Sequence, residues 1–242
     1  MKAELIDVMG DDLRVANAAR VSFDKESEWQ IGYETGIDHY GAYEVERKDL
    51  HDRDIKLINY LAKHDHWTPF SHVMITMRET VPIFVARQRF KHKVGFTENE
   101  ISRRYVDDDL KFWTPEEWRA KAENVKQGSS NEIVSEVLIE LGNFNPDIEI
   151  GYNDIIALAE RWYYANVHIC AEQRRAILPQ ALYTSYYVTG SLAAWARAYK
   201  LRSHPHAQKE IQDLAAQWNE VISNIPELKH SWNALISQKI EI

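Results

Sequence analysis

The chain is poor in cysteine and has no long apolar run. Cys170 is its only cysteine, which excludes an internal disulfide and a cysteine-rich zinc site, and we expect no metal centre. No stretch of about eighteen apolar residues occurs, so the sequence predicts no transmembrane helix and no membrane partner. The opening segment MKAELIDVMGDD lacks the basic and apolar regions of a signal peptide, and we therefore expect a cytoplasmic location.

Positive charge is the minority sign, yet it is concentrated in one segment. The net charge of -8 argues against a nucleic-acid partner, because such proteins usually carry a basic footprint. Between Arg87 and Arg104, however, six lysines and arginines stand against two acids, Glu98 and Glu100. This local pattern favours a discrete anionic ligand.

Repeats and low-complexity tracts are also lacking. With 242 residues, 45% of them hydrophobic, the chain can bury a sizeable core, and we expect residues 1–242 to form one domain. The best internal break, Gly128-Ser129-Ser130, is short and resembles a surface turn more than a linker.

Hydrophobic periodicity predicts an α+β fold, with a central mixed or antiparallel sheet flanked by several long helices. Alternation of apolar and polar residues predicts strands at 3–8 and 72–79, whereas residues 24–45 read as polar and irregular. Helices are expected to end at Arg20, to open at Pro82 and to begin at a capping box, Thr114 to Glu117. Helical spacing predicts further helices at 54–64, 152–177, 191–201 and 205–222.

The cationic segment has two parts that suit a phosphorylated ligand. The string RQRFKHK (87–93) reads as a cationic helix end, and NEISRRY (99–105) follows a short loop that contains Gly95. Cations near a helix carboxyl end are stabilised by its dipole, so plain capping is one interpretation. Two successive arginines beside Ser102 and Tyr105 offer the planar, multi-donor geometry that phosphate requires, which capping does not explain.

At these residues the chain resembles the flavin-dependent thymidylate synthases. The family pattern runs from a proline-led helix through Arg-His-Arg to Asn-Glu-x-Ser-x-Arg-Tyr, and here PIFVARQ (82–88) and NEISRRY (99–105) match its two ends. The centre of this segment departs from the family pattern in two ways. Lys91-His92-Lys93 stands where Arg-His-Arg is usual, and eight residues rather than seven separate Lys93 from Ser102. Lysine keeps the charge but loses the guanidinium fork. Four more blocks lie in the expected order: AARVSF (18–23), HWTPFSH (66–72), RAILP (175–179) and LRSHPHAQ (201–208).

The resemblance implies a role for each matching residue. Arg202 would be the catalytic residue, lying against uracil and favouring ionisation at N3, which raises electron density at C5. His66 would contact folate. The dUMP site would comprise Gln88, Lys91, Glu100, Ser102, Arg103, Arg104, Arg175 and Arg202. The FAD site would comprise Thr68, Lys91, His92, Lys93, Glu100, Ser191 and Arg197.

The resemblance also implies the reaction and the assembly. It implies FAD-dependent reductive methylation of dUMP to dTMP, with 5,10-methylenetetrahydrofolate as carbon donor and NADPH as reductant. The family builds its sites from several subunits of a homotetramer, so this chain is expected to bind copies of itself.

Other interpretations remain open at this point. Arg202 could form only a helix-end salt bridge, and His66 could be a packed turn residue. Cys170 is interpreted as a buried structural thiol within a helix, and Ser102 as a binding residue without a partner base. For the whole chain, the alternatives are a flavin and folate enzyme that adds a methyl or hydroxymethyl group to another pyrimidine nucleotide, and a nucleotide-binding module without catalysis.

Overall fold

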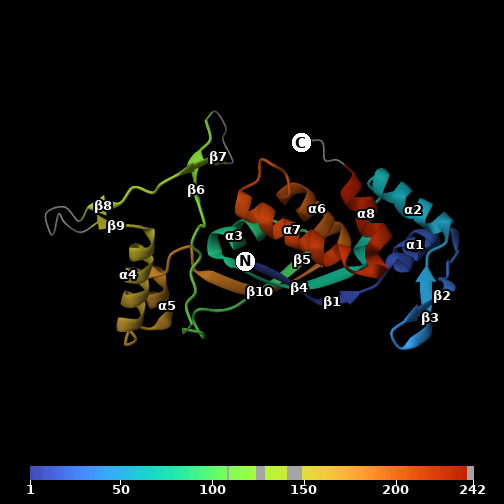
Figure 1. Ribbon diagram of the computed structural model, residues 1–242, viewed down its shortest axis with the longest axis horizontal. Helices are drawn as coiled ribbons and strands as arrows, with labels where there is room; N and C mark the ends of the chain where they lie inside the picture. Colours follow the sequence, from blue (N-terminus) through green and yellow to red (C-terminus); the bar gives the residue numbers. More distant parts are fainter. Residues whose placement is uncertain (108, 124–128, 141–148, 239–242) are drawn as a thin grey trace.

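The protein is built on a four-stranded antiparallel sheet with helices packed over one face (Figure 1). The computed structural model describes residues 1–107, 109–123, 129–140 and 149–238. The strand order is β1-β4-β10-β5. These strands are β1 (Lys2–Met9), β4 (Met74–Pro82), β10 (Tyr183–Ser191) and β5 (Phe96–Glu100). Of the two predicted sheet types, mixed or antiparallel, this sheet is antiparallel.

The two central strands, β4 and β10, have one buried and one open face. Their burial alternates residue by residue, so that Ile75, Met77 and Val188 point into the core. On the open face the hydroxyls of Thr76 and Thr189, which pair across the strands, are 2.9 Å apart. This alternation is the physical reason that one face of the sheet carries the helices.

Helices α3 (Ile83–Arg89), α6 (Leu192–Arg202), α7 (Lys209–Ser223) and α8 (Lys229–Ser237) cover the buried face (Figure 1). Three tryptophans, Trp195, Trp218 and Trp232, are fully buried among them. The indole N–H of Trp195 donates to the carbonyl oxygen of Ile75 at 3.2 Å, which ties α6 to the sheet. Large buried rings of this kind dominate core stability.

Two peripheral regions flank this core (Figure 1). On one side are α1 (Asp12–Arg20), α2 (Asp52–Lys63) and a hairpin of β2 (Gln30–Asp38) and β3 (Gly41–Asp49). On the other are β6 (Trp118–Lys121), β7 (Ser129–Val134), β8 (Ile139–Glu140), β9 (Glu149–Ile150), α4 (Tyr152–Ala165) and α5 (Ala171–Arg174). Single 3₁₀ turns lie at Val21–Phe23, Pro69–His72, Arg175–Ile177 and Pro226–Leu228. No helix in the described ranges is both long and apolar enough to cross a bilayer.

Several predicted elements are confirmed, namely β1, β4 and helices α1, α2, α3 and α6. Two other predictions were wrong because non-local strand pairing outweighs local patterns. Residues 24–45 are not irregular, since β2 and most of β3 lie there and pair along their whole length. The Thr114 capping box starts no helix, because Trp118 pairs with Val134 in a strand instead. The helix predicted over 205–222 is present as α7, but it begins at Lys209.

The long helix predicted over 152–177 is divided. It ends at Ala165, where the Asn166 amide donates to the carbonyl oxygen of Trp162 at 2.8 Å. Cys170 then lies at the amino-terminal cap of α5 and is exposed, so the prediction of a buried helical thiol was wrong. Ser129 begins β7, whereas Gly128 lies outside the described residues.

Candidate functional site

Eight of the predicted site residues line three separate clefts, which we name the Trp67 cleft, the Arg202 cleft and the Arg103 cleft. Their volumes are about 460, 770 and 180 Å³. The three sets of lining residues have no member in common. A single chain therefore does not gather all of its predicted ligand contacts into one pocket.

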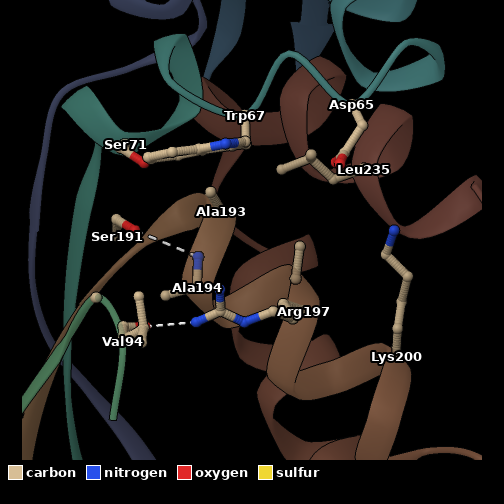
Figure 2. Close-up of a pocket in the computed structure, with 12 residues that line it drawn as sticks. Asp65, Trp67, Ser71, Val94, Ser191, Ala193, Ala194, Arg197, Lys200 and Leu235 are labelled. Atoms are coloured by element: carbon tan, nitrogen blue, oxygen red, sulfur yellow. Dashed lines mark hydrogen bonds between the residues drawn. The ribbon is translucent and has the colours of Figure 1, made fainter. Parts of the chain in front are cut away.

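The Trp67 cleft holds two of the predicted FAD residues, Ser191 and Arg197 (Figure 2). Ser191 caps the amino terminus of α6, and its hydroxyl oxygen accepts from the Ala194 N–H at 3.2 Å. Arg197 lies farther along the same helix and donates to the carbonyl oxygen of Val94. The cleft is thus the point where the start of α6 meets the loop that follows α3.

That loop approaches α6 so closely that it requires glycine. Gly95 has a φ of 81°, in the left-handed region, and a Cβ atom there would lie 2.9 Å from the Cβ of Ala194. Trp67 forms another wall, with 57% of its surface exposed. Burial lowers the pKa of Lys200 at the cleft edge, while the nearby Asp65 carboxylate opposes that shift. The cleft therefore combines an aromatic wall with two cations.

The Arg202 cleft brings together Gln88 and Lys91 from the α3 region and Arg202 from the end of α6. Arg202 is held by two hydrogen bonds: its Nε donates to His92 Nε2 at 2.8 Å, and its Nη2 donates to the Gln88 carbonyl oxygen at 3.1 Å. His92 is buried, and burial together with the charges of Arg202, Arg89 and Arg197 lowers its pKa to about 4. The imidazole is consequently neutral, and its Nε2 can accept the hydrogen bond from the guanidinium. Arg202 forms no salt bridge within the described residues, so the helix-end alternative is not supported there.

Sequence reasoning missed several residues of this cleft. Arg87 lies four residues before Lys91 in the cationic segment, a spacing that could have indicated a shared face. Trp113 and Arg119 reach the cleft from a distant segment, and no local pattern predicts that contact. A chain of hydrogen bonds supports them by linking Gln88, Gln208, Glu210 and Arg119.

The Arg103 cleft combines Glu100, Arg103 and Arg175, three of the predicted dUMP residues. The hydroxyl of Thr184, on strand β10, donates to the Glu100 carboxylate at 2.5 Å. This bond ties Glu100, at the end of β5, to the neighbouring strand. Burial raises the pKa of the Tyr183 phenol that lines the same cleft. The cleft thus gathers two guanidinium groups around an anchored carboxylate.

Ser102 and Arg104 adjoin this cleft in the chain. The Arg104 N–H donates to the Ser102 hydroxyl oxygen at 3.3 Å, and the Arg104 guanidinium pairs with Glu172. Both charged side chains are about half exposed, so this ion pair is weak and can exchange for another anion.

Three more predicted residues, Lys93, Thr68 and His66, do not line any of the three clefts. Lys93 forms an ion pair with Glu98. Thr68 is exposed beside Trp67, and the exposed His66 ring lies 6.1 Å from that of Tyr60. His206 lines the Arg202 cleft from the turn before α7 and does not begin that helix, contrary to prediction.

A buried charge cluster lies behind the Arg202 cleft. Arg89 and Glu79 are both fully buried, with Arg89 Nε and Glu79 Oε1 3.3 Å apart. The Tyr186 hydroxyl donates to the other Glu79 oxygen at 2.5 Å, and burial raises the Tyr186 pKa well above its usual value. The rings of Phe96, Trp195 and Trp218 surround the guanidinium at 4.2 to 5.2 Å.

Comparison with known proteins identifies the family. The description of the matching family is "thymidylate synthase complementing protein", and the match covers residues 4–227. The chain belongs to this family. It is 32% identical to the flavin-dependent thymidylate synthase of Thermosipho africanus over 231 residues, which cover 94% of this chain and 86% of the relative. It is 33% identical to the enzyme of the same name from Thermus thermophilus over 218 residues, or 90% of this chain and 70% of the relative.

The motif resemblance to the flavin-dependent thymidylate synthases is therefore confirmed, and the chain is an enzyme of that family. A solved structure extends the likeness to the fold. The UMP/dUMP methylase PolB from Streptomyces cacaoi, bound with 5-Br dUMP, superposes with a TM-score of 0.69 at 22% identity. The superposition covers 98% of this chain and 94% of the other. At this level of identity the likeness concerns the fold alone.

Proposed function

We propose that the chain converts dUMP to dTMP with bound FAD, using 5,10-methylenetetrahydrofolate as carbon donor and NADPH as reductant. Family membership, the flavin-dependent relatives and the dUMP analogue in the PolB structure support this reaction. One observation carries the proposal. The Arg202 guanidinium lies in the wall of a cleft lined by aromatic and cationic side chains, and a hydrogen bond to the neutral His92 holds it there.

The Arg202 cleft suits the pyrimidine end of the substrate. Within the described residues, Arg202 Nη1 has no hydrogen-bond partner, and neither Arg87 nor Lys91 has an ion-pair partner. A fixed guanidinium beside the uracil stabilises negative charge that develops on N3 and the adjoining carbonyl. That charge raises the nucleophilicity of C5, the carbon that receives the one-carbon unit.

The Trp67 cleft suits a flavin. Its volume falls within the range of roughly 300–1,000 Å³ that is usual for ligand pockets. Trp67 offers a face for a planar ring, and Arg197 and Lys200 offer positive charge for an anionic cofactor. We assign the FAD residues Ser191 and Arg197 to this cleft, together with Thr68, which is next to Trp67 in the chain. A flavin bound there would supply reducing equivalents and the chemistry for one-carbon transfer.

We further propose that residues 1–242 form a single such domain and that the active site is completed in a homotetramer. The Arg103 cleft would supply its cations to the phosphate of a nucleotide held in the Arg202 cleft of another subunit. Exposed apolar side chains support such contacts, including Leu158 at 62% and Trp162 at 41% exposure on α4. The cytoplasmic location and the folate role of His66 also remain proposals.

The proposed function is tested by an absorbance spectrum and a product assay. The purified protein should absorb in the near ultraviolet and blue as a flavoprotein does, and NADPH should bleach that absorbance. Incubation with NADPH, methylenetetrahydrofolate and either dUMP, UMP or dCMP should yield one product, dTMP, from dUMP alone, as judged by mass spectrometry. A hydroxymethylated product, or a preference for UMP or dCMP, would show that the enzyme catalyses a different reaction from the one proposed. Absence of flavin binding would refute the proposed function.

Arg104→Ala tests whether Arg104, which adjoins the Arg103 cleft in the chain, binds the phosphate of dUMP. We expect KM for dUMP to rise by about tenfold or more, because a charge-assisted hydrogen bond to a phosphate is lost. The matched control is Glu172→Gln, which removes the partner of Arg104 and should not raise KM. Unchanged dUMP affinity in Arg104→Ala would exclude a phosphate role for this residue.

A further inference from the structure

We infer that His92 is a positioning residue that orients Arg202, rather than a residue whose main role is to hold the flavin. This inference rests on the proposed function and assigns His92 a specific part in it. The geometry that carries it is the 2.8 Å hydrogen bond from Arg202 Nε to His92 Nε2, between a side chain on α6 and the turn that ends α3.

The hydrogen bond requires one protonation state and one tautomer of His92. Nε2 accepts a hydrogen bond only when it carries no proton, so the ring proton must lie on Nδ1. The charged groups that face the imidazole are Arg202 and Arg197 from α6 and Arg89 from α3, and all are cations. Their charge and the burial of the ring both oppose protonation.

Arg202 has a second hydrogen-bond acceptor, a backbone carbonyl oxygen, and the two bonds together orient its guanidinium. Nη2 donates to the Gln88 carbonyl oxygen at 3.1 Å while Nε is held by His92, so the plane of the guanidinium is set by both bonds. The Nη1 group keeps its donors for a ligand in the Arg202 cleft. Without His92 the guanidinium keeps its charge but loses this orientation.

Two features of the fold explain why His92 stays in place. Its backbone N–H donates to the Arg89 carbonyl oxygen at 3.1 Å, in the turn that closes α3. Arg89 itself is anchored by Glu79 in the core. The imidazole therefore extends from a rigid part of the structure, as positioning of a catalytic group requires.

The inference is tested first by kinetics. His92→Ala should lower kcat by about 100-fold with little change in flavin content, because a misplaced catalytic group costs about that much. His92→Gln should recover most of this loss, since its amide oxygen can accept at the position of Nε2 and does not titrate. In a double-mutant cycle, adding His92→Ala to Arg202→Lys should cause no further loss, because lysine lacks the Nε–H donor.

Other kinetic results would overturn the inference. Additive losses in the cycle would show that His92 acts independently of Arg202. Loss of flavin from His92→Ala, with normal turnover once FAD is restored at saturating concentration, would show that it is a cofactor-binding residue. No recovery in His92→Gln would show that the acceptor atom is not what matters.

A second measurement does not depend on activity, so it separates this inference from the proposed function. Histidine ¹⁵N chemical shifts report the ring tautomer and its protonation. In the purified protein, His92 should remain a neutral Nδ1–H tautomer as the pH is lowered from 8 toward its pKa of about 4, and protonation below that point should break the bond to Arg202. Protonation of His92 near pH 6.5, or a proton on Nε2 at neutral pH, would refute the inference even if dTMP is formed.

Discussion

Arg202→Ala is expected to lower kcat for dTMP formation by about 10²- to 10³-fold while the protein retains its flavin. The magnitude is that of removing a fixed donor from a site where negative charge develops in the transition state. Flavin is retained because Arg202 lines the Arg202 cleft and not the Trp67 cleft. The measurement is single-turnover dTMP formation at saturating dUMP, with flavin content read from absorbance.

The control for Arg202→Ala is a change of the same kind far from the clefts. Arg47→Ala removes an exposed arginine of the β2–β3 hairpin, whose partner is Glu34 at 2.8 Å, and should leave turnover unaffected. Near-normal turnover in Arg202→Ala would remove this residue from the mechanism. A parallel loss in the Arg47 variant would show that the assay reports stability instead.

Arg89→Met is expected to destabilise the fold by about 3–5 kcal/mol, because it leaves the Glu79 carboxylate buried without its cation. Both partners are almost completely buried, and among the described residues only the Tyr186 hydroxyl would still donate to that carboxylate. Methionine matches the length of the aliphatic stem, so the change tests the charge more than the volume. The measurement is the free energy of unfolding from urea denaturation.

Two matched variants make the result interpretable. Arg47→Met breaks an exposed ion pair, with side-chain exposures of 62% and 55%, and should cost no more than about 1 kcal/mol. Adding Glu79→Gln to Arg89→Met should recover much of the lost stability, because a neutral amide can still accept from Tyr186. An Arg89→Met variant as stable as Arg47→Met would show that the buried pair contributes nothing.

The elements that could be predicted are those whose pattern is local. Strand β4 alternates residue by residue, and helix α6 follows a regular helical spacing, so each was recognised from its own residues. The β2–β3 hairpin was missed because its strands are stabilised by pairing with each other and carry many charged residues. Trp118 likewise lies in a strand and not in the helix that the Thr114 capping box predicted, because it pairs with Val134.

In the candidate site, too, some features could be predicted from the sequence and others depend on contacts between distant segments. The order of the motifs identified the family. Of the residues predicted to bind dUMP, Glu100, Arg103 and Arg175 line one cleft, whereas Gln88, Lys91 and Arg202 line another. The sequence did not indicate that Trp113 and Arg119 would line the Arg202 cleft, because they approach it from a separate peripheral segment. The arrangement of the clefts depends on packing between segments that are distant in the chain.

What the sequence determined by itself was the family, the cationic segment and the residues that carry charge, because these depend on residue identity and order. The tertiary structure decided what each cation does. Arg89 became a core residue, Arg104 an exposed one, and Arg202 a guanidinium held by His92. All three are the same side chain, and their burial and partners, which are set by the packing of α3, α6 and the sheet, give them different chemistry.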